Sequence, residues 1–302
     1  WSRFGEGCRR FAEGFNTEIT GVAGGVLAFD NAVYTTIQPD LWKLTDPGNT
    51  GVATQRISLS HGHGIHIGFG GHDMHGPTIG PDGRIYWSQG DKGFNITSKE
   101  GKNYTRLYEG GVFRVDPDGS NLEMFAHGLR NPQELAFDDH GNLFTGDNDC
   151  DQGDRERWVY LVEGGDSGWR VGWQHPPLGK ENNMWLTEKM WEPRDARKDQ
   201  PAYVLSPILN IPDGPSGVVH YPGTGLPDSY KGHFFLVDFR GGRGSGIHTF
   251  ANKQNGATFD CVDREIFVSL GEEVDRLTRL AASLDVLAGA ELDRPNATDV
   301  DL

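Results

Sequence analysis

The sequence predicts an all-β fold of the propeller type. A phrase made of a turn and a few β-prone residues, GRIYWSQGD (83–91), returns as GNLFTGDND (141–149), with looser copies at 232–240 and 31–37. A second apolar run precedes three of these copies, so each pair is typical of a hairpin with Gly, Asp or Asn in its turn. Such a unit cannot bury its own apolar faces, so its recurrence favours a propeller over a β-sandwich.

The composition agrees with this fold class and limits the partners. Of the 302 residues, 36% are hydrophobic, which is enough for a sizeable core, and 43 glycines with 16 prolines suit many turns. The net charge of −15 argues against nucleic acid as a partner and suits a protein that binds Ca²⁺. No run of residues resembles a transmembrane span or a signal peptide.

The units follow one another along the chain with one interruption. After a lead-in at 1–20, the propeller is expected over 21–270, broken by an insertion at 176–213 that is rich in Trp, Pro and charge. Long insertions often carry function. Residues 271–302 form a tail in which an amphipathic helix is expected, because apolar residues recur there at helical spacing: Val274, Leu277, Leu280, Leu284 and Leu287.

Two histidines stand at a fixed distance before the strongest phrase. His72 and His75 precede GPDG, and in a propeller the loops that lead into such strands surround the central channel. A histidine there can act as a general base, because imidazole titrates near neutrality. Upstream, His61 and His63 would share one side of a strand, which suits either a metal pair or a solvated loop.

A second set of polar residues surrounds the next copy of the phrase. Arg130 and Asn131 precede their strand as the histidines precede theirs, and a guanidinium with an amide could hold a carboxylate or a quinone oxygen. After the strand, GDNDCDQGD resembles a calcium loop, although its spacing is not that of an EF-hand, and a solvated acidic turn is the alternative. Its carboxylates are Asp147, Asp149, Asp151 and Asp154.

The remaining candidates are less distinctive. Asp238 occupies the place in its strand that Asp147 occupies earlier, and Arg240 beyond it could form an ion pair or contact a substrate. Cys8, Cys150 and Cys261 form no CxxC motif, so neither a zinc knuckle nor covalent haem is encoded, and one disulfide or three thiols are both compatible. No GxSxG elbow, Walker loop or dinucleotide-binding GxGxxG occurs.

Four motifs together carry a resemblance to a known family: HDMHGPTIGPDGRIYWSQGD, GLRNPQELAFDDHGNLFTGDND, EGGDSGW and SGVVHY…VDFRG. With them, the sequence resembles the glucose/sorbosone dehydrogenase family over residues 10–270. The likeness is greatest to the large membrane-bound-dehydrogenase proteins of planctomycetes. The resemblance implies a six-bladed β-propeller that oxidises sugars outside the cytoplasm with pyrroloquinoline quinone (PQQ) and Ca²⁺. The chain leaves the family pattern near Leu270, so the last blade is missing or incomplete.

The resemblance also implies roles for single residues. Counting eight residues back from Gly80 gives His72 as the base, with His75 as the fallback. The family's GLRN motif assigns quinone contacts to Arg130 and Asn131. The other residues implied are Gln133 and Arg240 for the quinone, and the Asn148–Cys150 region, through its main-chain oxygens, for Ca²⁺.

Three functions compete on this evidence. The first is a quinoprotein-like dehydrogenase for a sugar or another alcohol. The second is a hydrolase or lactonase that depends on Ca²⁺ or Zn²⁺, and the third is a non-catalytic propeller that binds a glycan or a protein through the tryptophans Trp169, Trp173, Trp185 and Trp191. A missing blade would expose two strand edges, which the helical tail, a second copy of the chain or an electron-accepting partner could cover.

Overall fold

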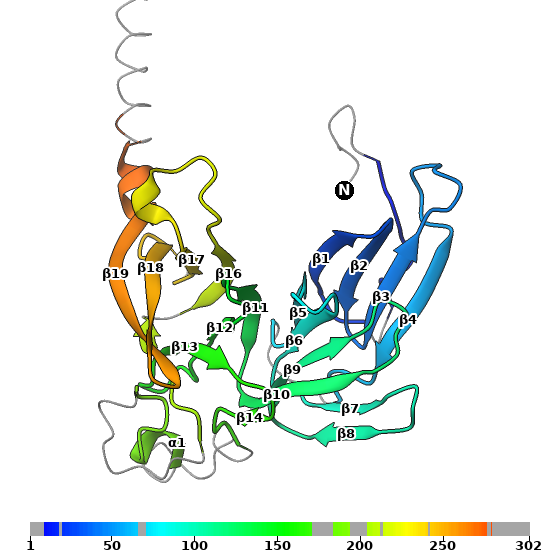
Figure 1. Cartoon of the computed structure of the whole chain (residues 1–302), viewed down its shortest axis with the longest axis horizontal. Helices are drawn as coiled ribbons and strands as arrows, with labels where there is room; N and C mark the ends of the chain where they lie inside the picture. The colour runs from blue at the N-terminus through cyan, green and yellow to red at the C-terminus, as the bar shows by residue number, and fades with distance from the viewer. Residues whose placement is uncertain are drawn as a thin grey trace, which may run out of the picture.

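Four antiparallel β-sheets make up most of what the computed structural model describes, namely residues 9–17, 20–65, 71–170, 184–193, 204–211, 214–240, 242–276 and 279. The sheets follow one another along the chain and are arranged around an arc (Figure 1). The predicted mostly-β architecture of propeller type is confirmed at this level.

The first sheet has the order β1-β2-β3-β4, with β1 (Ala23–Phe29), β2 (Ala32–Ile37), β3 (Asp40–Thr45) and β4 (Gln55–His61). A two-residue turn joins β1 to β2, and its residues Asp30 and Asn31 have φ of 48° and 56°. Asn and Asp tolerate this left-handed conformation, and two such residues match the twist of a hairpin.

The second sheet has the order β14-β10-β9-β6-β5. Its antiparallel strands are β5 (Met74–Ile79), β6 (Ile85–Gln89), β9 (Gly110–Val115) and β10 (Glu123–Leu129). A separate hairpin, β7 (Phe94–Thr97) with β8 (Asn103–Arg106), is inserted between β6 and β9. The short β14 (Gly165–Asp166) belongs to the EGGDSGW segment and pairs in parallel with β10 at the edge of the sheet.

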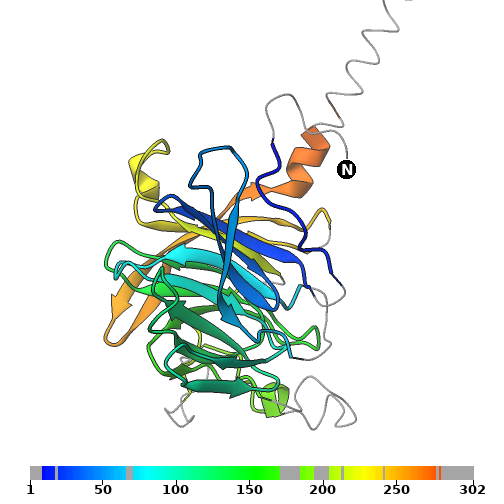
Figure 2. The same cartoon turned by 90° about the vertical axis from the view of Figure 1, so that its right-hand side faces the viewer.

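The third and fourth sheets complete the described arc. The third contains β11 (Pro132–Phe137), β12 (Leu143–Asp147), β13 (Glu156–Leu161) and β15 (Leu209–Ile211). The fourth contains β16 (Pro215–His220), β17 (His233–Asp238), β18 (Gly246–Asn255) and β19 (Thr258–Ser269). Two short helices, α1 (Met184–Thr187) and the 3-10 helix η3 (Asp228–Tyr230), lie in connections, and α1 lies at the opposite end of the molecule from helical residues 270–276 (Figure 2).

The first strands of the four sheets are neighbours on the inner side of the arc. β1 contacts β5, β5 contacts β11, and β11 contacts β16. All four copies of the sequence phrase fall on the second strand of a sheet: β2, β6, β12 and β17. The loops that lead into the inner strands therefore come together, as a propeller requires.

Adjacent sheets share apolar cores that are rich in aromatic residues. Side chains alternate across a strand, so Trp87 enters the core with the first sheet, whereas its neighbour Tyr86 enters the core with the third. In the same way Leu143 faces the second sheet and Phe144 faces the fourth. The consecutive apolar residues of the repeated phrase are explained by this burial on both faces.

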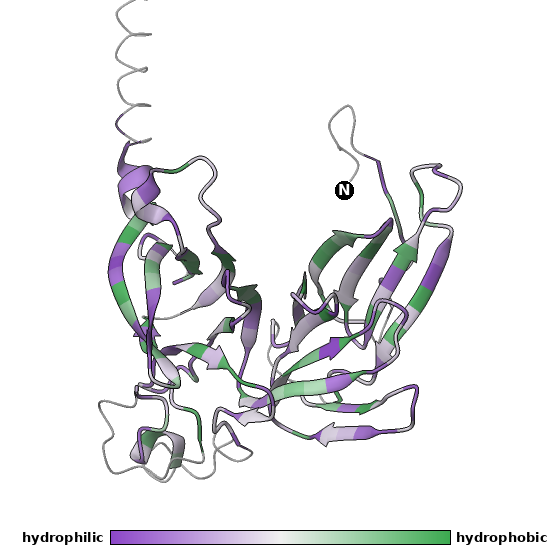
Figure 3. Cartoon of the chain, viewed as in Figure 1, coloured by the Kyte–Doolittle hydropathy of each residue, from purple (hydrophilic) through white to green (hydrophobic). Residues whose placement is uncertain are grey.

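The two ends of the arc differ in how they are covered. Phe15 of the lead-in packs on Trp42 of the first sheet, with ring centroids 5.6 Å apart. Hydrophobic bands alternate with hydrophilic ones along β19 of the fourth sheet (Figure 3), where Phe267 is 37% exposed. The outer face of the fourth sheet is the one that does not pack against the third sheet. A groove of about 440 Å³ opens on it, lined by apolar side chains that include Val219, Tyr221, Phe235, Val237, Ile247 and Phe267.

Some predicted boundaries lie outside the described part of the chain. Residues 270–276 are helical, which agrees with the start of the predicted tail helix, but most of that helix is not described. Of the insertion at 176–213, only 184–193 and 204–211 are described. The domain limits stay a prediction. In the described residues, no helix has both the length and the apolar character that crossing a membrane would need.

Candidate functional site

The histidine and arginine loops meet between the second and third sheets. His72 precedes β5 and His75 lies at its start, while Arg130 and Asn131 directly precede β11. The segment after β6 joins the two loops: the main-chain N–H of Asp91 donates to the carbonyl of Arg130 at 2.7 Å, and that of Gly90 donates to the carbonyl of Asp73 at 2.9 Å.

Gly90 allows this close approach of the two loops. A Cβ on Gly90 would lie 2.7 Å from Asn131 Oδ1 and 2.7 Å from the His72 carbonyl. Gln133 also reaches the histidine loop, because its Nε2 donates to the carbonyl of Gly71 at 3.4 Å. The structure therefore brings together five of the predicted site residues: His72, His75, Arg130, Asn131 and Gln133.

One repeated device holds these loops in place. In the second, third and fourth sheets, the last residue of the second strand pairs with the first residue of the inner strand. The side chain of that last residue also forms a hydrogen bond with the segment that precedes the inner strand. These residues are Gln89, which donates to His72 O, Asp147, which accepts from the N–H groups of Arg130 and Asn131, and Asp238, which accepts from Gly214 N–H. The equivalence of Asp147 and Asp238, predicted from the sequence, is confirmed by this register.

His72 is buried and is oriented by a carboxylate. Its Nδ1 lies 2.7 Å from Asp91 Oδ1, and both side chains are almost closed to solvent, at 6% and 4% exposure. A carboxylate only accepts, so Nδ1 carries the proton and Nε2 is the ring nitrogen that can accept one. Sequence reasoning missed Asp91, although it ends the phrase GRIYWSQGD just as Asp149 ends GNLFTGDND.

His75 is held differently. Its Nε2 lies 2.7 Å from the carbonyl oxygen of Gly71, so this nitrogen carries the proton. Burial lowers the pKa of His75, which keeps the ring neutral. The arrangement suits His75 as a donor that fixes its own loop, and it leaves His72 as the better placed base. Both assignments stay predictions.

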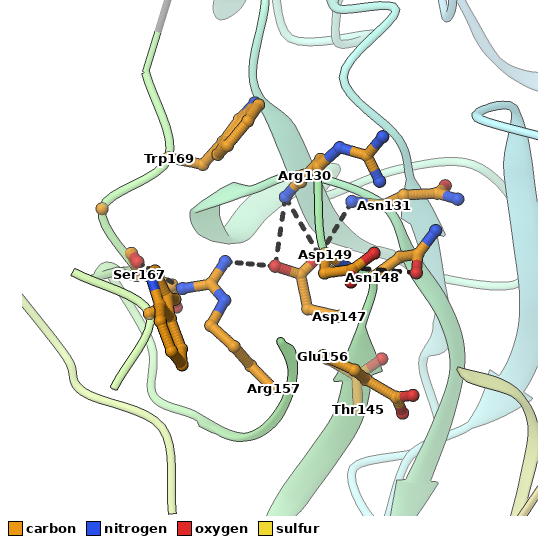
Figure 4. A network of polar contacts seen from close by, with 12 residues as sticks. Arg130, Asn131, Thr145, Asp147, Asn148, Asp149, Glu156, Arg157, Ser167 and Trp169 are labelled. Atoms are coloured by element: carbon orange, nitrogen blue, oxygen red, sulfur yellow. Dashed lines mark hydrogen bonds and ion pairs between the residues drawn. The ribbon is translucent and has the colours of Figure 1, made fainter. Parts of the chain in front are cut away.

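Arg130 places unsatisfied hydrogen-bond donors in this region. The residue is 3% exposed, and neither Nε nor Nη1 has a hydrogen-bond partner among the described residues. The guanidinium lies 6.0 Å above the ring of Trp169 and points away from Asp147 (Figure 4). Buried donors without partners are costly, so the side chain suits a ligand with carboxylate or carbonyl oxygens.

The acidic residues of GDNDCDQGD do not converge on one point. Asp147 is used by the N–H groups of Arg130 and Asn131 and by an ion pair with Arg157 (Figure 4), while Asp154 accepts from Cys150 and Trp185. Asn148 accepts from the N–H of Asp149. In the part of the chain that the structure describes, no three His, Cys, Asp or Glu side chains form a group that could hold a metal ion.

Asp149 is a carboxylate of this loop with an altered pKa. Its burial, together with the charges of Asp154 and Asp151, raises the pKa of Asp149 to about 7. Asp151 is 86% exposed and lies 3.9 Å from Arg130 Nη2. Negative charge is therefore concentrated beside Arg130, and the assignment of Ca²⁺ to this loop stays a prediction.

Arg240 is paired with Asp238. Its Nε and Nη2 lie 2.9 and 2.8 Å from Asp238 Oδ2, and His248 Nε2 lies 3.1 Å from the same oxygen. The ion pair is the alternative that the geometry supports, and a cofactor contact by Arg240 stays a prediction.

The two described cysteines are not joined in a disulfide. Cys150 is buried, its thiol donates to Asp154 Oδ1 at 3.1 Å, and its pKa is raised by burial. Burial also raises the pKa of Cys261 to about 11. Neither thiol has the environment of a reactive nucleophile. Cys8 lies outside the described residues.

Similar solved structures include sugar dehydrogenases. The PQQ-bound aldose sugar dehydrogenase of Streptomyces coelicolor has 18% identity and a TM-score of 0.52 over 83% of this chain and 69% of that chain. Two structures described as glucose dehydrogenase have 14% identity and TM-scores of 0.56 and 0.55, over 80% and 82% of this chain and 69% and 72% of theirs. At these identities the likeness concerns the fold.

Sequence comparison gives a family without an assigned activity. No protein of curated function matches this sequence significantly. A family model described as a domain of unknown function, DUF7133, matches residues 8–269, which is most of the chain. The chain therefore belongs to the DUF7133 family.

Proposed function

We propose that this chain is a quinoprotein-like dehydrogenase that oxidises a sugar or another alcohol. One observation carries the proposal: the Arg130 guanidinium has two buried nitrogens without a hydrogen-bond partner among the described residues, and the segment of Asp91 joins its loop to that of His72, the histidine that Asp91 orients. A base and an oxygen-binding cation are thereby provided at one place. The likeness in fold to sugar dehydrogenases supports the same hypothesis of a dehydrogenase.

The chemistry assigned to these residues is proton abstraction coupled to hydride loss. His72 Nε2 takes the proton of the substrate hydroxyl as the carbon–oxygen double bond forms, and the hydrogen on that carbon leaves with its electron pair as hydride. Asp91 stabilises the imidazolium that results, since its carboxylate already accepts from Nδ1. PQQ, when bound, supplies the hydride acceptor.

The residues present fit part of such a cofactor. PQQ carries carboxylates and adjacent carbonyl oxygens, and the unpartnered nitrogens of Arg130 suit one of these groups. Asn131 and Gln133 lie beside it, and Arg240 is the further cation that the family resemblance proposes. Ca²⁺ would bind at main-chain oxygens of the Asn148–Cys150 region, where Asp149, Asp151 and Asp154 concentrate negative charge.

The setting of the protein follows the same analogy. We infer that it works outside the cytoplasm, as the resembling dehydrogenases do, with a small sugar or alcohol as substrate. The exposed outer face of the fourth sheet is compatible with a second copy or an electron-accepting partner beside it.

Reconstitution tests the proposal. The purified chain is mixed with PQQ and Ca²⁺, and reduction of a dye is followed with a panel of aldoses and simple alcohols. Activity is expected for wild type and for His140→Gln, an exposed turn histidine, but lower by about 10²–10⁴-fold for His72→Gln. Absence of bound quinone and of dye reduction would reject the dehydrogenase, and turnover of a lactone in the same samples would favour a lactonase.

A further inference from the structure

The EGGDSGW segment carries a buried tryptophan to the candidate site. Its β14 pairs in parallel with β10, the Ser167 N–H donates to the His127 carbonyl at 3.0 Å, and the Trp169 N–H donates to the Gly128 carbonyl at 2.8 Å. Trp169 is fully buried. The main chain of β10 therefore fixes the position of the Trp169 indole.

The indole N–H of Trp169 binds the carboxylate that orients His72. Trp169 Nε1 donates to Asp91 Oδ2 at 3.2 Å, while Asp91 Oδ1 lies 2.7 Å from His72 Nδ1. Each oxygen of one buried carboxylate thus has its own partner. An indole N–H can only donate, so this contact has one direction and does not depend on a choice of tautomer.

The same indole also contacts the cationic side of the site, because the Arg130 guanidinium lies 6.0 Å from its ring centroid. One side chain therefore touches both halves of the candidate site, with its edge on Asp91 and its face on Arg130. These two contacts come from a segment remote in sequence from both loops.

We propose that Trp169 is a positioning residue, whose N–H fixes the rotation of the Asp91 carboxylate and thereby holds the proton of His72 on Nδ1. The catalytic consequence rests on the proposed role of His72 as a base. The terminal torsion of an aspartate is broad, so one hydrogen bond to histidine leaves the carboxylate free to turn. A second bond on the other oxygen restricts that rotation, and Nε2 stays the proton-accepting nitrogen.

Nitrogen-15 NMR of histidine-labelled protein tests this without cofactor or substrate. Trp169→Phe keeps an aromatic face for Arg130 and removes the N–H. The matched control is Trp158→Phe, since Trp158 is equally buried but lies in the core between the third and fourth sheets and donates to Asn252 Oδ1 at 3.2 Å. The ratio of Nδ1–H to Nε2–H tautomers of His72 is expected to fall about tenfold in Trp169→Phe, as for loss of a bond to a charged group, and to be unchanged in Trp158→Phe. An unchanged ratio in Trp169→Phe overturns the proposal.

A second measurement covers failure of that variant to fold. Hydrogen exchange of the Trp169 indole N–H in wild type is compared with that in Asp91→Ala and in Asp228→Ala, a surface control. Faster exchange confined to Asp91→Ala supports the bond, and equal exchange in all three overturns it. Neither measurement uses dye reduction. An inactive wild type would therefore reject the dehydrogenase proposal without deciding whether Trp169 positions Asp91.

Discussion

Asp147 and Arg157 form a buried ion pair, in which the two side chains are 0% and 1% exposed to solvent. The pair joins the site loop to the third sheet, because Asp147 also accepts from the Arg130 and Asn131 N–H groups. Arg157 in turn donates to the Ser167 carbonyl at 2.6 Å and lies over the ring of Trp185. Removing one partner of a buried pair leaves the other charge uncompensated.

Asp147→Asn should therefore destabilise the fold by about 3–5 kcal/mol. Urea unfolding followed by tryptophan fluorescence measures the change. Asp228→Ala is the control, because Asp228 is 92% exposed beside Lys231 and should alter stability by less than about 0.5 kcal/mol. Equal stability of the two variants would show that the buried charge of Arg157 finds another partner.

Arg130→Met should weaken the binding of PQQ without lowering the stability of the fold. The substitution removes the unpartnered guanidinium nitrogens, so the unfolding free energy is expected to stay the same or to rise by about 1 kcal/mol. Affinity for PQQ with Ca²⁺, followed through tryptophan fluorescence, should fall at least about tenfold, because a charge-assisted bond is lost. The control is Arg106→Met, since that arginine is 37% exposed and lies beside Glu109. Unchanged affinity in Arg130→Met would remove Arg130 from the site.

The repeated phrase made the architecture predictable, because burial on both faces forces consecutive apolar residues such as Tyr86 and Trp87. The same repeat placed His72 and Arg130 before inner strands, and adjacency of β5 with β11 then brought their loops together. The end of the repeated phrase singles out Asp91 as a position, but the sequence could not indicate that its carboxylate would orient His72. That contact depends on a hairpin register and on a loop approach that only the folded sheets define.

Carboxylates were the least predictable part of the site. Alternating Asp147, Asp149 and Asp151 suggested one calcium loop, but the strand ends at Asp147, so that residue faces the buried N–H groups of the preceding loop. Asp151 instead turns outward in a left-handed conformation, with φ of 56°. Spacing alone cannot tell a carboxylate used by the backbone from one available to a ligand.

His63 should make the fold sensitive to acid. His61 and His63 do not form the metal pair that strand alternation suggested, because His61 is exposed beside Asp40 whereas His63 packs between Trp87 and Phe113. Burial lowers the pKa of His63 to about 3, while an unfolded histidine titrates near 6.5. Between pH 6.5 and 3, only the unfolded state binds a proton at His63. The contribution of neutral His63 to the free energy of unfolding is therefore fully present above pH 6.5 and is lost as the pH falls toward 3.

The expected loss from this residue is up to about 5 kcal/mol by pH 3. Urea unfolding at a series of pH values measures it. His63→Phe should flatten the slope between pH 6.5 and 3 whatever its effect at neutral pH, and His61→Gln should keep the wild-type slope. A slope that survives in His63→Phe would assign the acid sensitivity to other groups.

Gly90 offers a test of whether the two loops must touch. A methyl group there would meet Asn131 Oδ1 and the His72 carbonyl at 2.7 Å each, and the backbone carbonyl cannot yield without moving its loop. Gly90→Ala should therefore cost about 1–3 kcal/mol and weaken PQQ binding together with stability. Gly217→Ala is the matched control, because the nearest atoms to its Cβ lie at 3.4 and 3.8 Å. Wild-type binding in Gly90→Ala would mean that His72 and Arg130 act at separate places, and the dehydrogenase proposal would then lose the observation that carries it.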